Sequence, residues 1–336
     1  VVERNLAEKN IYRKELSRDE FIEKIWEWKE YSGSTIINQL KRLGSSCDWS
    51  RERFTMDEGL SSAVRKVFVS LYNEGLIYKD QALVNWDTKF KTAISDLEVV
   101  PTDVSTQLYY IKYPCSNSKT ITIATVRPET IFGDVAIAVN PEDSRYLSLK
   151  NETFTIPLTS RSIPLILDEY SDPDMGSGAV KITPAHDFND FEVGKRHNLE
   201  LLNILNDDGS LNENCPAEYQ GMDRFDARKQ VVKALKENGF IEKIEDYKTT
   251  IPYGDRSNTI VEPYLTHQWF CNAEELAKQA MKVVNDGETK FFPQNWEKTY
   301  FQWMENIRPW CISRQIWWGH QIPVWYGPDG KEFCAE

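Results

Sequence analysis

The stretch Lys181–Asp190 reads Lys-Ile-Thr-Pro-Ala-His-Asp-Phe-Asn-Asp, and it joins a short strand-like segment to two acids three residues apart. Pro184 should end the strand, because proline has no N–H to donate and its φ is fixed. If a helix follows, Asp187 and Asp190 lie on one face of its first turn, where the helix dipole favours negative charge. Two acids in this position could bind a cationic or hydroxyl-bearing ligand at the end of a sheet.

The same spacing has a plainer interpretation, in which Asp187 is a helix cap and Asp190 is a solvated acid of the first turn. Spacing alone favours this interpretation. His186 lies beside both acids, so a general base is also conceivable. Because no serine or cysteine nucleophile is an obvious partner, we favour a histidine that holds its own loop through a local hydrogen bond.

A second segment strengthens the case for a ligand site. Thr125–Thr130 reads Thr-Val-Arg-Pro-Glu-Thr and follows the strand-like run 121–124. It offers two hydroxyls, one guanidinium and one carboxylate. A guanidinium binds phosphate or carboxylate through paired donors, and a hydroxyl can hold a substrate oxygen or a water. Considered alone, the segment is equally well a strand-to-turn connection with Thr130 as a cap.

Size and composition bound the class of protein. The chain has 336 residues, enough for two or three domains, and its 40% hydrophobic and 27% charged residues indicate a globular protein. The net charge of −12 argues against a surface coated with nucleic-acid-binding charge, although it leaves room for a local RNA-binding groove. No apolar run approaches the length of a membrane span, so no membrane partner is expected. The six cysteines include no Cys-x-x-Cys pair, and no metal site is expected.

The organisation along the chain changes twice. Helical periodicity dominates residues 4–80 and returns after about 253, whereas short strand-like runs separated by turn signals such as Asn117-Ser fill about 88–252. A β-rich segment between two helix-rich ones suggests a compact, curved β-domain inserted into another fold. Within the β-rich segment, helices are expected at 188–197 and 223–238.

Two details of the helix-rich segments carry separate expectations. Residues 76–78 and 82–86 predict two short strands. The stretch Trp310–Trp325 is dense in tryptophan and interrupted by glycine and proline. Its aromatic side chains suit either plain core packing or the wall of a small apolar pocket, and the sequence leaves both open.

Taken together, these segments resemble the valyl-tRNA synthetases, a family of class I aminoacyl-tRNA synthetases, over essentially the whole chain. The form Trp317–His320 resembles the valine enzymes more than their isoleucine and leucine relatives. Two positions depart from the family pattern: Thr88 stands where proline is expected, and Met175 where an aromatic residue is frequent. The segments that carry the resemblance are Gln39–Asp57, Leu83–Asp87, Thr92–Glu98, Thr125–Thr130, Lys181–Asp190, Val261–Pro263, Gln268–Phe270 and Trp310–Trp325.

The resemblance implies an α/β architecture. It places a β-barrel-like editing domain at 101–252, inserted between two partial segments of a class I nucleotide-binding, Rossmann-like fold. Residues 1–100 would form the helical part of the first half of that catalytic domain, and residues 253–336 would return to its second half.

The resemblance also implies an activity. Threonine is nearly the shape of valine, and an apolar pocket rejects the extra hydroxyl only about a hundredfold, a magnitude already established for the valine enzyme. A second site that recognises the hydroxyl would hydrolyse the mischarged threonyl-tRNA(Val) by water attack on the ester. The alternative, from a different class, is a tRNA-docking module without turnover of its own. A pocket for leucine- or isoleucine-type errors is a further possibility, which Trp317–His320 disfavours.

The parent enzyme would serve protein biosynthesis by ligating valine to tRNA(Val) with ATP and Mg. The sequence contains neither a His-x-Gly-His element nor a Lys-Met-Ser-Lys-Ser element. We therefore expect that this stretch does not itself activate valine. Editing would need no cofactor or metal, its partners would be the acceptor end of tRNA(Val) and a threonine or valine moiety, and the protein would be a cytoplasmic monomer.

The resemblance assigns roles to the acids and to the residues of their strand. Asp190 would pair with the α-ammonium of the attached threonine, because an ammonium offers donors and no acceptor. Asp187, Lys181 and Thr183 would read the side-chain hydroxyl. A bound valine would leave these polar groups unpaired, which is costly.

The resemblance assigns the remaining roles to the second segment. Arg127, Thr125 and Thr130 would hold the terminal adenosine, the scissile ester or the attacking water, without a division of these tasks among them. Glu129 would orient Arg127, and Met175 would line the same pocket.

Overall fold

The computed structural model describes residues 1–115 and 119–336, and the chain divides into two compact units. The β-rich unit comprises Lys79–Phe270 together with Pro309–Arg314. The helix-rich unit comprises Val1–Tyr78, Cys271–Arg308 and Gln315–Glu336. The β-rich unit is therefore wider on both sides than the expected inserted domain at 101–252. The turn expected at Asn117-Ser118 lies outside the described residues.

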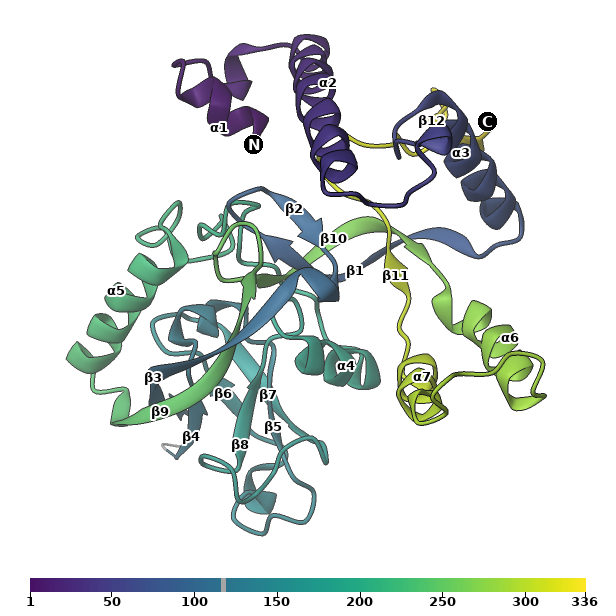
Figure 1. Cartoon of the computed structure of the whole chain (residues 1–336). Helices are drawn as coiled ribbons and strands as arrows, with labels where there is room; N and C mark the ends of the chain where they lie inside the picture. The colour runs from purple at the N-terminus through teal and green to yellow at the C-terminus, as the bar shows by residue number, and fades with distance from the viewer. Residues whose placement is uncertain (116–118) are drawn as a thin grey trace. The chain divides into compact units, whose positions relative to one another are not determined.

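Two sheets form most of the β-rich unit (Figure 1). In the first, the long strand β3 pairs antiparallel with β4 on one side and with β9 on the other. In the second, with the order β6-β7-β5-β8, β5 and β7 are parallel and the other two pairs are antiparallel. The strand bounds are β3 Val99–Pro114, β4 Thr120–Thr125, β9 Ile241–Gly254, β6 Thr153–Thr155, β7 Ser162–Leu167, β5 Ala136–Val139 and β8 Ala179–Ile182.

The strands of the predicted barrel do not form one closed sheet in the described part of the chain. A barrel needs a continuous ladder of paired strands. Between the β3 edge and the β6 edge, the structure records an isolated antiparallel bridge, from Cys115 to Phe154, in place of a continuous ladder. The architecture is mixed α/β, as expected. Barrel closure and the Rossmann-like character of the flanking segments stay predictions.

The core of the β-rich unit lies where its two sheets and one helix meet. Ile123 of β4, Ile137 of β5 and Phe154 of β6 are fully buried in it. Helix α5 (Arg224–Glu237) adds Val231 and Leu235, which lie one turn apart on one face. Each such side chain stabilises the fold by about 1.5–3 kcal/mol through its removal from water. Helix α5 also lies within one residue, at each end, of the helix expected at 223–238.

Helix α4 (Phe188–His197) has the bounds expected from the sequence, and it follows β8 after a short turn (Figure 1). Asp187 is its N-cap, and the left-handed Asn198 (φ 51°) is its C-cap. Gly194 allows the helix to lie against the proline that ends β8, since a Cβ at this position would stand 2.9 Å from the Pro184 ring. The acids of the first turn are thereby held beside the end of β8.

A four-stranded sheet with the order β11-β10-β1-β2 contains most of the remaining strands. The two short strands expected at 76–78 and 82–86 are one continuous strand, so that expectation is wrong. The residues between them, 79–81, are exposed and polar, which interrupted the apolar pattern without interrupting the strand. The bounds are β1 Ile77–Asp87, β2 Thr92–Ile94, β10 Glu262–Cys271 and β11 Trp310–Cys311.

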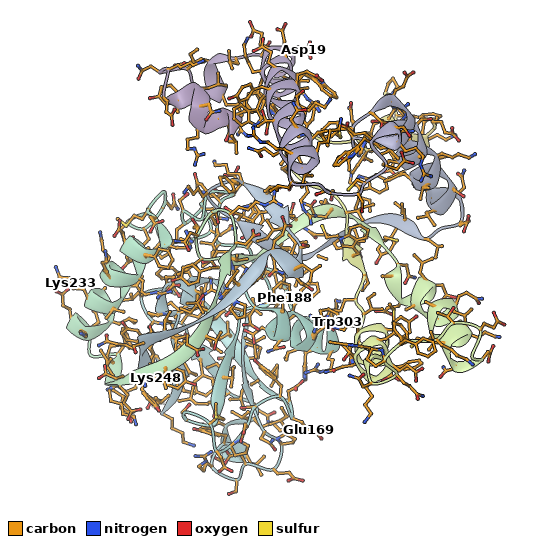
Figure 2. The ribbon with its side chains drawn as sticks, in the orientation of Figure 1. Asp19, Glu169, Phe188, Lys233, Lys248 and Trp303 are labelled. Carbon is orange, nitrogen blue, oxygen red and sulfur yellow. The ribbon has the colours of Figure 1, made fainter. Side chains whose placement is uncertain are left out.

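The helix-rich unit explains part of the tryptophan-rich stretch. Trp317 packs edge-to-face on Phe21 of α2 at 5.7 Å between ring centroids, and Trp318 packs on Trp26 of the same helix at 5.0 Å. These two rings therefore contribute to side-chain packing against α2. Trp303 of α7 is exposed (Figure 2). The elements are α1 Val2–Ala7, α2 Arg18–Arg42, α3 Glu58–Asn73, α6 Ala273–Asn285, α7 Trp296–Glu305, β12 Val324–Tyr326 and β13 Glu332–Cys334.

Short 3-10 turns complete the structure, and one of them, η4, contributes to the candidate site. The 3-10 turns are η1 Arg13–Glu15, η2 Trp49–Arg51, η3 Asp96–Glu98, η4 Pro128–Gly133 and η5 Leu147–Leu149.

Among the described residues, no helix combines the length and the apolar character that crossing a membrane would require.

Candidate functional site

The two acids at the start of α4 have different environments. Asp187 accepts hydrogen bonds from the backbone N–H groups of Asn189 at 2.8 Å and Asp190 at 3.1 Å, so it is a helix cap, as the plainer interpretation predicted. Asp190 is not a solvated acid. It is only 5% exposed, and one of its carboxylate oxygens accepts the N–H of Thr183 at 2.9 Å. The helix therefore begins directly after Asp187, at Phe188 (Figure 2).

Asp190 is a buried carboxyl for which the described residues supply no cationic partner. Burial raises its pKa to about 7, with a further rise from the negative charge of Asp187 and an opposing effect of Lys181. In the described part of the chain, no Lys, Arg or His lies within ion-pair distance of it. A buried carboxylate that lacks a counter-ion destabilises the fold and is found preferentially at functional sites. Asp190 is thus suited to receive a cation from a ligand.

Arg127 brings a guanidinium to the same place from the end of β4. Its Nη1 donates to the carbonyl of His186 at 2.9 Å, and its Nη2 donates to the carboxylate of Glu262. Burial lowers the pKa of Arg127, but the carboxylates of Glu262, Glu129 and Asp187 raise it by more. The pKa of Arg127 is therefore raised overall. The negative charge of Asp187 therefore acts directly on this guanidinium. The side chain retains 27% exposure, so a ligand can still reach it.

The other residues of Thr125–Thr130 hold Arg127 in its turn. Thr125 accepts the N–H of Arg127 at 3.0 Å through Oγ1, and the Thr130 hydroxyl donates to the carbonyl of Arg127 at 2.9 Å. Glu129 is enclosed: it accepts two bonds from the Arg228 guanidinium at 2.7 and 2.6 Å and lies 3.7 Å from Arg127. Its carboxylate therefore supports Arg127 and is closed to solvent.

Lys181 and Thr183 of the predicted site meet at a buried acid that sequence reasoning missed. One oxygen of Asp134, which is 0% exposed, accepts from Lys181 Nζ at 3.0 Å and from the Thr183 hydroxyl at 2.9 Å. Its other oxygen accepts the hydroxyl of Tyr113 at 2.6 Å. Burial raises the pKa of Asp134, against the opposing effects of these partners, and burial together with Asp134 raises that of Tyr113. Gly133 permits this approach, because a Cβ there would stand 2.9 Å from Thr183 Cγ2.

His186 holds its loop through a hydrogen bond, as expected, but the partner is distant in the sequence and not local. It is buried, and its Nε2 accepts the N–H of Ile204 at 2.9 Å. Burial, assisted by the positive charges of Arg127 and Lys181, lowers its pKa well below the usual value, so the ring is neutral. A ring whose Nε2 is occupied and whose proton affinity is suppressed does not serve as a general base.

Met175 lies near the segment Thr125–Thr130, and Tyr170 lies near the acids. Met175 is 60% exposed in the turn 172–178, and a Cβ on the adjacent Gly176 would stand 2.9 Å from Ala124, which precedes Thr125. Tyr170, which sequence reasoning missed, lies close enough to Asp190 and Asp187 that their charges add to burial in raising the pKa of its phenol.

The residues that the sequence missed belong to long-range networks. Arg224 and Arg228 are one helical turn apart on α5, and that spacing predicts a shared face. Glu262 lies in the segment Val261–Pro263, which carries part of the family resemblance. No signal in the sequence distinguished Asp134 from an ordinary turn residue. Among residues 1–115 and 119–336, no cluster of three His, Cys, Asp or Glu side chains is arranged to hold a metal ion.

The sequence as a whole matches one family. The model of the family described as "tRNA synthetases class I (I, L, M and V)" matches residues 1–336, so the chain belongs to the class I tRNA synthetases. Within this class, the chain is similar along its entire length to valine–tRNA ligases, as the sequence motifs predicted. It is 60% identical to that of Pelagibacter ubique over 336 residues, 58% to that of Mesorhizobium japonicum over 361 and 55% to that of Francisella tularensis over 337.

The match is complete for this chain and partial for its relatives. All of the chain is covered in each case, but only 38%, 39% and 37% of those three relatives. A solved ternary complex of LeuRS, tRNA and LeuAMS from Agrobacterium radiobacter aligns with 95% of this chain and 42% of its own, at 16% identity and a TM-score of 0.34. That superposition is too poor to carry an argument, and the family assignment rests on the sequence matches.

Proposed function

We propose that the β-rich unit contains a post-transfer editing site, which hydrolyses the ester of threonyl-tRNA(Val). The observation that carries the proposal is the buried carboxyl of Asp190, which has no cationic partner among the described residues. The α-ammonium of an aminoacyl ester supplies the missing charge, and charge-assisted hydrogen bonds to it are about twice as strong as neutral ones. The similarity of the chain to valine–tRNA ligases supports tRNA(Val) as the tRNA that carries the ester.

The side-chain hydroxyl of threonine would be read by Asp187, Lys181 and Thr183. Asp134 fixes the last two through one shared oxygen, so their positions do not depend on a ligand. A valine in the same place leaves polar groups without partners, at about 1–3 kcal/mol for each buried group. This penalty gives the site its preference for the threonyl ester over the valyl ester.

The ester would be cleaved by a positioned water. Thr125 accepts a backbone N–H in the structure, which leaves its hydroxyl proton for the ester oxygen, while Arg127 binds the adenosine end. Water attacks the ester carbon, the bond to the ribose oxygen breaks, and that oxygen takes a proton. The products are threonine and uncharged tRNA. Thr130 supports Arg127, and Met175 borders the amino acid.

We also propose that the longer protein to which this stretch corresponds is a valine–tRNA ligase. It would join valine to tRNA(Val) at the expense of ATP with Mg in the cytoplasm, as a monomer. The support is the identity of 60% to a curated valine–tRNA ligase along the whole chain. The editing site would then correct the errors of that reaction.

The direct test is deacylation of threonyl-tRNA(Val) by the chain and by its Asp190→Ala variant. We expect at least a hundredfold lower kcat/KM for the variant, since a charged hydrogen bond of about 1.5–3 kcal/mol and the orientation of the ester are both lost. The matched control is Asp226→Ala, which removes an exposed acid of α5 that pairs with Lys229. Equal rates for the chain and Asp190→Ala, or salt-sensitive tRNA binding with no hydrolysis, would contradict editing and favour a docking module.

The pH dependence of the same reaction gives a second prediction. Asp190 binds an ammonium only when ionised, and its pKa is raised to about 7. We therefore expect kcat/KM, corrected for spontaneous hydrolysis, to fall tenfold for each pH unit below about 7. It should fall again above about 8, where the substrate amine loses its proton.

A variant tests whether Asp190 causes the fall of kcat/KM at acidic pH, called the acidic limb of the pH profile. Asp187→Asn retains a capping side chain but removes the negative charge that adds to burial in raising the pKa of Asp190. The limb should therefore move to lower pH in this variant. If the activity falls over the same pH range in this variant as in the unsubstituted chain, the charge of Asp187 does not contribute to the raised pKa of Asp190.

A further inference from the structure

Glu262, the first residue of β10, joins two arginines inside the β-rich unit. Its carboxylate is almost completely enclosed, with 3% of the residue exposed. Oε1 accepts from Arg224 Nε at 2.7 Å, and Oε2 accepts from Arg127 Nη2. Each oxygen of one buried carboxylate is thus committed to a different guanidinium.

The far end of this connection is rigid. Arg224 is buried at the start of α5, and its Nη2 also donates to the carbonyl of Ile260 at 3.2 Å. Its guanidinium lies over the Phe225 ring, 4.3 Å from the centroid. Arg224 is therefore held by a backbone group, a ring and a carboxylate, and it fixes Glu262 in turn.

The near end is the guanidinium proposed to bind the adenosine end of the substrate. Besides Glu262, Arg127 meets the carbonyl of His186 through Nη1 and the carboxylate of Glu129 through Nε. His186 immediately precedes Asp187 in the chain. The three contacts hold Arg127 in one orientation relative to the start of α4. An arginine has several rotatable bonds, and fixing it in advance removes an entropic cost from substrate binding.

We propose that Glu262 is a positioning residue of the editing site. Its carboxylate holds the Arg127 guanidinium in place and is itself held by Arg224. This inference rests on the proposed function. Glu262 touches no substrate, and its effect on hydrolysis passes entirely through Arg127. Because a displacement of about 1 Å in a positioning group can lower a rate by about a hundredfold, loss of this carboxylate should have a measurable effect on the reaction.

The test is a double-variant cycle on threonyl-tRNA(Val) hydrolysis. Glu262→Gln keeps the shape of the side chain and removes its charge. We expect kcat/KM to fall about tenfold to a hundredfold in the unsubstituted chain and to change less than twofold in an Arg127→Gln background. Glu245→Gln, at an exposed acid paired with Lys243, is the matched control. All rates are measured at a temperature at which circular dichroism shows each variant folded.

A purely structural role for Glu262 gives a different result. The substitution would then lower the melting temperature without lowering the rate of the folded protein, or it would lower the rate equally in both backgrounds. Either result overturns the inference. If Glu262→Gln does not fold, Glu262→Asp keeps the charge and withdraws it by one methylene. The same cycle then applies, with the same expected dependence on Arg127.

A second measurement separates this inference from the proposed function. With ¹⁵N,¹³C-labelled arginine, rotation about the Cζ–Nε bond of Arg127 should be slow in the unsubstituted chain and at least tenfold faster in Glu262→Gln. If the chain hydrolyses no threonyl-tRNA(Val) but this change is observed, the editing proposal fails and the positioning of Arg127 stands. Equal rotation rates overturn the positioning role, whatever the activity.

Discussion

At pH 8 the Asp190→Asn variant should unfold at a higher temperature than the unsubstituted chain, although it should have lost hydrolytic activity. In the folded chain at this pH, Asp190 is a buried carboxylate with no ion-pair partner in the described structure, and its pKa is raised from 3.8 to about 7. Asparagine keeps an oxygen that accepts the N–H of Thr183. It removes the buried charge and keeps the shape.

The sign of the pH dependence follows from the raised pKa. A carboxyl whose pKa is higher in the folded state favours folding at low pH, where it is protonated. That contribution is lost as the pH rises from about 4 to about 7. The stabilisation by Asp190→Asn should therefore be on the order of 2–4 kcal/mol at pH 8 and should vanish near pH 4.

Chemical unfolding monitored between pH 4 and pH 8 measures this difference. Asp226→Asn, at an exposed position on α5, serves as the control and should leave stability within about 0.5 kcal/mol of the unsubstituted chain. A variant that is less stable than the unsubstituted chain at pH 8 would mean that the charge of Asp190 is already compensated. Asp190 would then need no ammonium from a ligand.

A gain in stability with a loss of activity is the result expected of a group kept for function. Asp187 gives the contrast. Its carboxylate caps α4 through two backbone N–H groups, so it stabilises the fold beside the proposed ligand site. The two acids are three residues apart, yet the carboxylate of Asp187 stabilises the fold and the buried carboxylate of Asp190 destabilises it.

Local signals predicted the part of the site that is local in the chain. The proline that ends β8, the cap at Asp187 and the apolar spacing that follows fix α4 at Phe188–His197, because all three act within a few residues. Periodicity did not predict that Asp190 is buried. Its enclosure comes from Thr183 and Tyr170, which approach from outside the helix.

The supporting groups were beyond sequence reasoning for the same reason. Asp134 meets Lys181 across 47 positions, and Glu262 meets Arg127 across 135. Only the folded sheets bring such residues together, and an acid after a glycine or at the start of a strand has no distinctive local pattern. Barrel closure is equally non-local, since it depends on strand edges whose pairing the alternating pattern does not specify.

Asp134→Asn should be the most destabilising single substitution in the site. The asparagine retains one oxygen in place of two, so it cannot accept from Tyr113 on one side and from Lys181 and Thr183 on the other. It also leaves the ammonium of Lys181 buried without its carboxylate. Removal of one partner from a buried ion pair costs about 3–5 kcal/mol.

Urea unfolding should therefore show a loss of about 3–5 kcal/mol for Asp134→Asn, whereas Asp134→Asn combined with Lys181→Met should recover part of it, because no unpaired charge remains. The two variants should nonetheless agree in one respect. Both lack a fixed ammonium beside Thr183, so both should lose selectivity. The ratio of kcat/KM for threonyl-tRNA(Val) to kcat/KM for valyl-tRNA(Val) should be at least tenfold lower in each variant than in the unsubstituted chain.

These two measurements separate the stabilising role of Asp134 from its role in recognition. A double variant no more stable than the single one would mean that Lys181 is not the group left uncompensated. Threonyl preference retained in the double variant would mean that Asp187 alone reads the hydroxyl. If stability is recovered while selectivity is not, then the Asp134–Lys181 pair exists to hold one ammonium in place for the substrate, since a methionine serves the fold as well.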